Sequence, residues 1–397
     1  MGIEYRKVTP EERMHVSRIQ NIVFGGGSRD EQEIREQIER GEYGSENTYG
    51  AVDESGRVIA GMDIIPYVMW FDGHKVDMTG IAGVASMPES RRQGNIRGIF
   101  EKVFEDIYAQ GAVFSHLYPF SYDYYRKFGY EHAGAARRYK LPLEYARKLR
   151  NSGTAHEFVK GYGDSDGVRA KLIEIYEAYA SRHNMMVSRS DSRWDDVFKI
   201  ALFGADRLYY WRDAAGEIKS WVKFKKEDDT MQVLDIAWLD NESMLGILQF
   251  MGMFDGAADN LKIKASPEFV PDLYWNEVYD IEQERANMGM SCVVNAKRVL
   301  ELLSKSGEGS FRIKIADDFA GWNNNIYAVE YGGGECAVKT CAGAADIEVS
   351  ARALTQMALG VFGLEQIINR ADVQLNANGQ TLAGVFCKKP MLLVDYF

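Results

Sequence analysis

The chain has 397 residues, of which 46% are hydrophobic and 26% charged, and its formal net charge at pH 7 is −11. This composition is typical of a folded chain of two or three domains and excludes an intrinsically disordered one. The acidic balance argues against a nucleic-acid partner, because phosphate binding needs a basic face, and it favours cationic small molecules or basic peptides.

The sequence carries no signal for secretion, membrane insertion or metal binding. Its first residues, MGIEYRKVTPEER, contain no apolar signal region, and no apolar stretch approaches the length of a membrane span. The four cysteines form no CxxC pair. We therefore expect buried structural thiols, no metal, no membrane contact and a cytoplasmic location.

Residues 1–148 are predicted to form a first α+β domain with one central sheet. The expected elements are helices over 10–24 and 30–40, strands over 48–52, 57–69 and 74–86, a helix over 95–109, a strand over 112–118, a helical turn over 122–127 and a strand after Gly129. Asp53 to Gly56 and Asp72-Gly73 are predicted hairpin turns.

Turn-rich segments at 151–155 and 161–167 mark the start of a second domain, over 149–288. It partly repeats the first: a helix over 168–183 precedes strands over 208–212, 218–225 and 231–239 and a helix over 241–254, with Asn241 as its cap. The junction DIAWLDNESMLG lacks an arginine-glycine loop. We expect this copy to bind no nucleotide cofactor.

A third α+β domain is predicted over 289–397. Its expected helices cover 295–304, 350–361 and 364–368, and its strands turn at Gly332 to Gly334. The chain ends on the apolar segment MLLVDYF, which we expect to dock on the body of the protein because frayed tails are polar.

A candidate anion site lies between the third strand and the helix that follows it. Pro88 ends the strand, and a basic, glycine-containing loop leads directly into a helix with one apolar face. The first amides of a helix have no backbone partner, and the helix dipole favours an anion there. The alternative is an exposed basic turn before an ordinary helix. The predicted cofactor residues are Val84, Ala85, Ser86, Arg91, Arg92, Gln93, Gly94, Asn95, Ile96 and Arg97.

A second segment, YDYYRKFGY, follows about thirty residues later. Together the two segments resemble the GNAT acetyltransferase superfamily, in which a Y-x-x-x-G-[FY] turn follows the cofactor loop. The resemblance places the family's catalytic tyrosine on Tyr125, which would protonate the departing coenzyme A thiolate. Tyrosine keeps its proton at neutral pH and can donate it. The alternative is that Tyr125 only packs the edge of the sheet.

The whole chain resembles the Eis (enhanced intracellular survival) family, which has two tandem GNAT-type domains, the second degenerate, and a C-terminal domain like a sterol carrier protein. The loop VASMPESRRQGNIRGIF, the turn YYRKFGY and the ending VDYF carry this resemblance. Ile96 departs from the small residue usual in single-domain GNATs and is similar to the bulky residue of Eis proteins. The resemblance implies acetyl-CoA as cosubstrate and a hexamer.

The resemblance also implies a general base, the terminal α-carboxylate of Phe397. The residues themselves support burial of this end but not catalysis, and His116 is the rival base. Asp395 and Phe24 are candidate contacts for a cationic substrate. We therefore predict an N-acetyltransferase acting on primary amines of aminoglycoside, polyamine or lysine type. The alternative is a lipid or acyl-carrier protein acting through its C-terminal domain.

Overall fold

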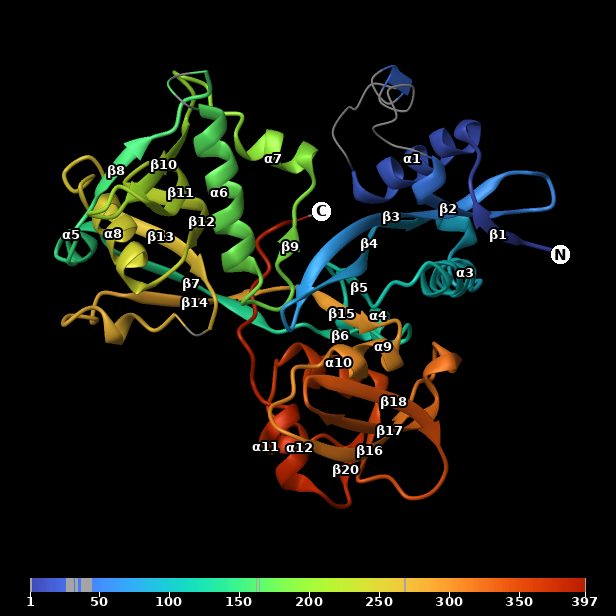
Figure 1. Cartoon of the computed structure of the whole chain (residues 1–397). Helices are drawn as coiled ribbons and strands as arrows, with labels where there is room; N and C mark the ends of the chain where they lie inside the picture. The colour runs from blue at the N-terminus through green and yellow to red at the C-terminus, as the bar shows by residue number, and fades with distance from the viewer. Residues whose placement is uncertain are drawn as a thin grey trace.

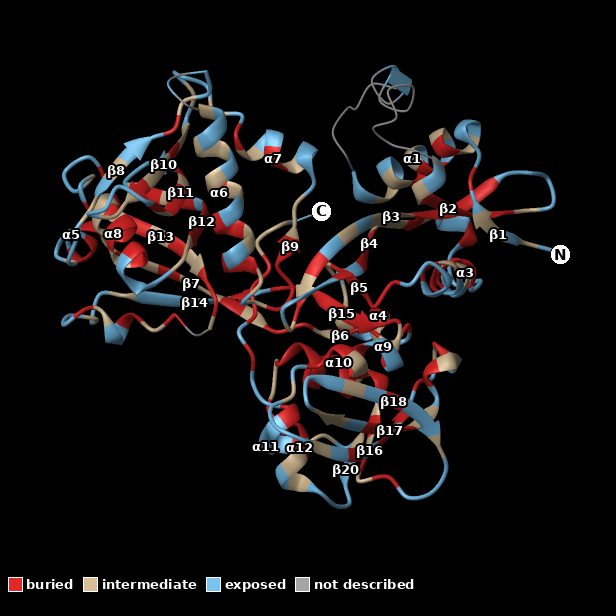
Figure 2. Cartoon of the chain, viewed as in Figure 1, coloured by how far each residue is buried: buried red, intermediate tan, exposed pale blue. Residues whose placement is uncertain are grey.

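The computed structural model describes residues 2–25, 32, 35–36, 45–161, 163, 165–267 and 269–396. Figure 1 shows three lobes, each built on one β-sheet with helices packed against it. Buried residues lie along these sheets and on the helix faces turned toward them (Figure 2). The predicted α+β architecture is confirmed.

The first lobe holds an eight-stranded sheet of order β1-β2-β3-β4-β5-β15-β6, whose eighth strand, β9 (Val187–Ser188), pairs with β3. Its elements are β1 (Glu4–Lys7), α1 (Pro10–Phe24), β2 (Thr48–Val52), β3 (Val58–Phe71), β4 (His74–Ser86), α3 (Asn95–Ala109), β5 (Phe114–Leu117), α4 (Tyr122–Arg126), β6 (Glu131–His132) and β15 (Met290–Val293). The predicted helix over 30–40 falls largely outside the described residues.

The last residues of strand β4 form one side of the candidate site. Strand β4 leaves β3 through a tight turn in which Asp72 and Gly73 both have positive φ, as a type I′ hairpin requires. It then pairs in parallel with β5, but this ladder ends at Ile81 opposite Leu117. Strand β4 itself continues to Ser86. Residues 82–86 of β4 therefore do not pair with β5, and helix α3 begins shortly after them.

The second lobe repeats this plan in a seven-stranded sheet of order β14-β7-β13-β12-β11-β10-β8. Its elements are β7 (Ala135–Pro142), α5 (Leu143–Arg147), β8 (Thr154–Glu157), α6 (Ser165–Ala180), α7 (Asp191–Val197), β10 (Asp206–Arg212), β11 (Ile218–Glu227), β12 (Thr230–Trp238), α8 (Asn241–Gly252), β13 (Asn260–Ala265) and β14 (Glu282–Asn287). The segment between α6 and α7 contributes β9 to the first sheet. Its parallel pair, β12 with β13, is joined by α8. The predicted repeat of the first fold is thus present.

The third lobe has a five-stranded sheet of order β18-β17-β16-β19-β20. Its elements are α9 (Ala296–Leu302), β16 (Gly309–Ala316), β17 (Asn325–Gly332), β18 (Glu335–Cys341), β19 (Ile347–Ser350), α10 (Ala351–Leu359), α11 (Leu364–Ile367), β20 (Val373–Leu375) and α12 (Gly379–Val385). The four cysteines are free thiols. Within the described ranges, no helix has both the length and the apolar character needed to cross a membrane.

Sheet membership does not follow the divisions at 148 and 288. The segment expected as one strand after Gly129 splits: β6 stays in the first sheet, whereas β7 crosses to the second, where it lies between β13 and β14. Strand β15 returns to the first sheet and lies between β5 and β6. The division of the chain into 1–148, 149–288 and 289–397 stays a prediction about folding units.

Candidate active site

The loop before α3 leaves the start of this helix open. Gly94 is the N-cap residue, has φ +84° and makes no side-chain capping hydrogen bond. A Cβ added at Gly94 would meet no atom within 4 Å, so the space beside this backbone is open. The first-turn amides of α3 therefore have no side-chain cap and can meet an anion. Apolar residues of α3, including Ile99, Phe100 and Val103, fix the helix on the sheet.

A cavity of about 640 Å³ lies against this helix start. Every predicted cofactor residue except Gln93 lines it; the Gln93 side chain instead donates to the Glu89 carbonyl oxygen at 3.3 Å. Phe24, one of the two predicted substrate contacts, also lines it and is largely exposed. The cavity combines a strand edge, an uncapped helix start and cationic side chains. This donor set fits the pantetheine arm and pyrophosphate of an acyl-coenzyme A.

Some lining residues were not predicted as ligands: Val23, Ser90, Phe120, Tyr124, Lys127 and Phe128. Tyr124, Lys127 and Phe128 belong to the segment YDYYRKFGY, so the sequence does carry a signal for them. Phe120 and Val23 carry no local signal. They reach the cavity only because the ends of α1 and β5 meet there.

Tyr125 adjoins this cavity from α4. Its side chain is buried, and its ring contacts those of Phe120, Tyr124 and Phe128, which all line the cavity. Burial, together with Tyr124, raises the pKa of Tyr125 above its ordinary value. A phenol in this environment keeps its proton across the physiological pH range.

His116, the rival base, lies inside the first sheet. It is buried, and its Nδ1 lies 2.8 Å from Ser291 Oγ on the neighbouring strand β15. Burial lowers the pKa of His116 to about 3, so the imidazole is neutral at pH 7. The structure thus favours a packing role for His116.

The C-terminal segment runs between the first and second lobes, as Figure 1 shows in red. We call residues 391–396 the strap. The Asp395 carboxylate accepts a hydrogen bond from Arg189 Nε at 3.0 Å, and the same guanidinium donates to Asp235 Oδ2 at 2.5 Å. Asp395, the other predicted substrate contact, is therefore largely buried in an ion pair with the protein itself. The predicted base, Phe397, lies outside the described residues.

Groups from both the first and the second lobe hold the strap. Tyr118 Oη donates to the Asp395 carbonyl oxygen at 3.2 Å, and its ring stacks on Tyr396 at 4.9 Å. From the second lobe, Lys264 Nζ donates to the Leu393 carbonyl oxygen at 2.5 Å and to Tyr396 Oη at 3.0 Å. The end of the strap therefore lies close to the carboxyl end of β5.

In the second lobe, the equivalent helix start is already capped by a side chain. Helix α8 occupies the place of α3, but its N-cap is Asp240, whose side chain accepts from the Ser243 amide at 2.8 Å. The prediction of Asn241 as the N-cap is wrong by one residue. The N-cap is Asp240, which has the extended conformation that a capping side chain needs. A carboxylate already occupies the position that a phosphate would need.

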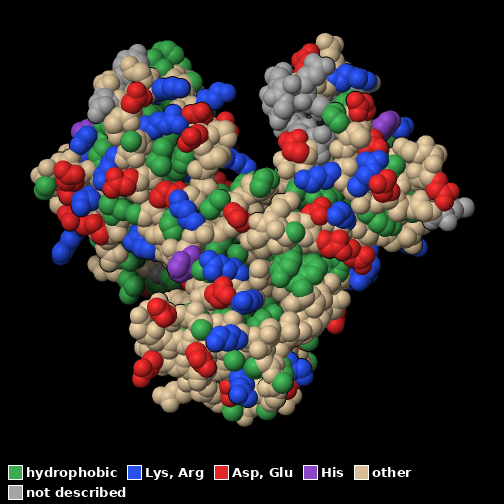
Figure 3. All heavy atoms as spheres, turned by 45° about the vertical axis from the view of Figure 1, so that its right-hand side comes forward, with side chains coloured by type: hydrophobic (Ala, Val, Ile, Leu, Met, Phe, Trp, Pro, Cys, Tyr) green, Lys and Arg blue, Asp and Glu red, His purple; other side chains and the backbone are tan. Residues whose placement is uncertain are grey.

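The face in Figure 3 shows acidic and basic side chains interspersed, and a notch between the first and second lobes. Within the described part of the chain, no group of His, Cys, Asp and Glu is arranged to hold a metal ion. The residues that line the cavity supply the Tyr124 hydroxyl, cationic side chains and the uncapped start of α3.

Comparison with known families agrees with this geometry. Residues 4–133 match the family described as an acetyltransferase (GNAT) domain, and residues 296–392 match the sterol carrier protein domain. The first lobe is a GNAT acetyltransferase domain, the third is a sterol carrier protein domain, and the protein is an enzyme of the acetyltransferase class.

Solved structures share the fold over the whole chain. They include a GCN5-related N-acetyltransferase from Anabaena variabilis (TM-score 0.82, 20% identity, all of both chains covered) and a probable N-acyltransferase from Enterococcus faecalis (0.84, 20%, all of both). Eis1 from Mycobacterium abscessus is similar at TM-score 0.79 and 16% identity, again over all of both chains. The Eis-type fold is therefore confirmed. No curated protein matches the sequence.

Proposed function

We propose that the protein transfers an acetyl group from acetyl-CoA to a primary amine of a cationic substrate. The observation that carries this proposal is the uncapped start of α3, which opens into a cavity lined by Arg91, Arg92 and Arg97. The amides there would bind the pyrophosphate, and the edge of β4 would hold the pantetheine arm. The bound cosubstrate supplies the thioester.

Tyr125 would complete the reaction at the leaving group. The amine nitrogen attacks the thioester carbonyl carbon, a C–N bond forms and the C–S bond breaks. Tyr125, which its raised pKa keeps protonated at neutral pH, then gives its phenolic proton to the departing thiolate. The nitrogen of the adduct loses a proton to give the amide, and that proton restores the phenol directly or through water. The substrate ammonium must first lose a proton. Family resemblance assigns that step to the α-carboxylate of Phe397, to which the strap leads.

The open helix start can be tested by placing a negative charge beside it. Gly94→Asp places a carboxylate beside the start of α3, where its negative charge would repel a pyrophosphate. We expect the dissociation constant for coenzyme A to rise roughly tenfold or more, measured by isothermal titration calorimetry.

Gly94→Asn is the matched control, because it has nearly the same size and also tolerates positive φ but carries no charge. Neither side chain has a close neighbour at its Cβ. Equal affinities of the Asp and Asn variants for coenzyme A would contradict the assignment of the phosphate site.

The substrate class and the base need separate assays. Coenzyme A release with a panel of aminoglycosides, polyamines and lysine-type amines would identify the acceptor, and the net charge of −11 favours cations among them. A chain extended beyond Phe397 should lose activity if the terminal carboxylate is the base. Full activity in a folded, extended protein would exclude that role. The hexamer implied by the resemblance is measurable by light scattering.

The lipid-carrier alternative gains no support from the cavity of about 470 Å³ in the third lobe. That cavity is lined mostly by polar or small residues: Ser306, Glu308, Tyr331, Asn378, Gly379, Gln380, Thr381 and Gly384. Such a lining does not suit an acyl chain, which needs an apolar surface.

A further inference from the structure

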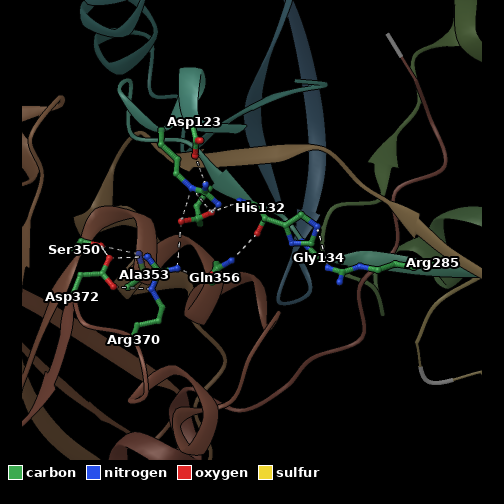
Figure 4. A network of polar contacts seen from close by, with 11 residues as sticks. Asp123, His132, Gly134, Arg285, Ser350, Ala353, Gln356, Arg370 and Asp372 are labelled. Carbon is green, nitrogen blue, oxygen red and sulfur yellow. Dashed lines mark hydrogen bonds and ion pairs between the residues drawn. The ribbon is translucent and has the colours of Figure 1, made fainter. Parts of the chain in front are cut away.

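A buried carboxylate joins the acetyltransferase lobe to the third lobe. Glu131, on β6, is 3% exposed and lies between two arginines. Arg126, the last residue of α4, donates to Glu131 Oε1 from Nη2 at 2.9 Å and from Nε at 3.2 Å. Arg370, from the third lobe, donates to Glu131 Oε2 at 3.3 Å. Figure 4 shows this network from close by.

Arg370 is itself fixed from the other side. Its Nε and Nη2 form a bidentate pair with the Asp372 carboxylate at 2.8 and 2.7 Å, and Asp372 in turn accepts from the Ser350 hydroxyl at 2.6 Å. Arg370 Nη1 also donates to Gln356 Oε1 at 2.8 Å. A planar guanidinium held at both edges has little freedom to move. Arg370 therefore presents a rigid contact to Glu131.

Gln356 adds a second link across the same interface. Its Nε2 donates to the carbonyl oxygen of His132, next to Glu131, at 3.0 Å. Burial works to raise the pKa of Glu131, but Arg126, the His132 amide and Arg370 together hold that pKa below its ordinary value. Glu131 is therefore a carboxylate at neutral pH and keeps both cations.

The contact between Arg126 and Glu131 matters because α4 also contains Tyr125. This helix has five residues, and a helix so short is not stable by itself, so tertiary contacts must fix it. Tyr125 precedes Arg126 in α4, and Lys127 and Phe128 follow it and line the cavity. A shift of Arg126 would thus move the candidate acid and one wall of the cavity together.

We propose that Arg370 is a positioning residue for acyl transfer: through Glu131 and Arg126, the sterol carrier domain holds α4 against the cofactor cavity. This inference rests on the proposed function. In this proposal the third lobe contributes to the first lobe's chemistry by positioning α4, and it needs no ligand bound in the third lobe.

The test compares Arg370→Met with Arg370→Lys in the full chain. We expect Arg370→Met to weaken coenzyme A binding and to lower kcat, each about tenfold, because α4 loses its fixed geometry. Arg370→Lys keeps the charge without the bidentate fork and should fall between Arg370→Met and wild type. Amide hydrogen exchange over residues 122–130 should be faster in Arg370→Met. Coenzyme A affinity and exchange rates equal to wild type would overturn the proposal.

The matched control breaks another charged contact between the same two lobes. Lys389 of the third lobe is buried and pairs with Asp72 in the β3–β4 turn, away from α4. We expect Lys389→Met to loosen lobe docking but to leave coenzyme A affinity and exchange in α4 as in wild type. Equal effects of Lys389→Met and Arg370→Met would overturn a specific role for Arg370.

The experiment separates this inference from the proposed function. If wild-type protein binds no coenzyme A, the proposed function fails, and hydrogen exchange in α4 alone decides the role of Arg370. Faster exchange in Arg370→Met would then support the positioning contact, and unchanged exchange would overturn it.

Discussion

Replacing Tyr125 with phenylalanine should lower kcat about 10²- to 10⁴-fold, the usual contribution of a general acid. The ring stays, so its packing against Phe120, Tyr124 and Phe128 is kept, and coenzyme A affinity should change little. Steady-state kinetics and calorimetry on the same preparation measure the two effects. A kcat within a factor of two of wild type would exclude Tyr125 as the acid.

Tyr130→Phe is the matched control for this variant. Tyr130 is also a buried tyrosine of this cluster, and its hydroxyl bonds to Ser115 Oγ at 2.6 Å, away from the cavity lining. We expect Tyr130→Phe to cost about 1 kcal/mol of stability for the lost hydrogen bond and to leave kcat near wild type. A large loss of kcat there would show that any buried hydroxyl of this cluster matters.

The pH profile gives a second measure of Tyr125. An acid works in its protonated form, so activity that depends on it is lost as pH rises through its pKa. Because burial raises this pKa above the ordinary value of 10.0, Tyr125 should cause no decline below about pH 10. A decline of kcat beginning near pH 8 would have to come from another group.

Replacing Arg189 with methionine should lower the free energy of unfolding by about 3–5 kcal/mol, the typical cost of removing one partner of a buried ion pair. The change leaves Asp235 and Asp395 as buried carboxylates without their cation. It also removes the guanidinium from the face of Tyr176, 4.1 Å from the ring centroid. Denaturant unfolding measures the loss.

A double variant and a neighbouring arginine test the cause. Adding Asp395→Asn to Arg189→Met removes one of the two buried carboxylates left without a cation. It should restore part of the lost free energy of unfolding. Arg193→Met, which removes a hydrogen bond to Tyr67 Oη at 2.7 Å from a less buried site, should cost much less. Equal losses in the two single variants would contradict a special role for Arg189 in holding the strap.

Local pattern was sufficient for the elements next to the cavity. The bounds of α1, β4 and α3 agree with their predicted ranges, because apolar periodicity and turn residues mark their limits within a few positions. The position of the loop between β4 and α3 was predicted for the same reason. A glycine N-cap, a preceding strand and a cationic run are all features of adjacent residues, and so is the Asp-Gly turn of the β3–β4 hairpin.

Long-range pairings could not be predicted in this way. Strand β7 reads like a continuation of the first sheet, yet it pairs with strands more than a hundred residues away. Asp395 looks like a free acidic residue near the chain end, and only the fold brings Arg189 to it. The link from Arg370 to Glu131 likewise spans 239 positions.

The sequence by itself therefore determined the class of the protein, from a strand and glycine loop that lead into a helix, a tyrosine-rich segment after them and a second copy of the fold without that loop. Tertiary structure alone decided how these parts are held. It supplied the strap between two lobes, the self-capped helix α8 and the ion pairs behind α4. The physical reason is that local conformation depends on neighbouring residues, whereas buried charge pairs depend on which distant surfaces meet when the chain packs.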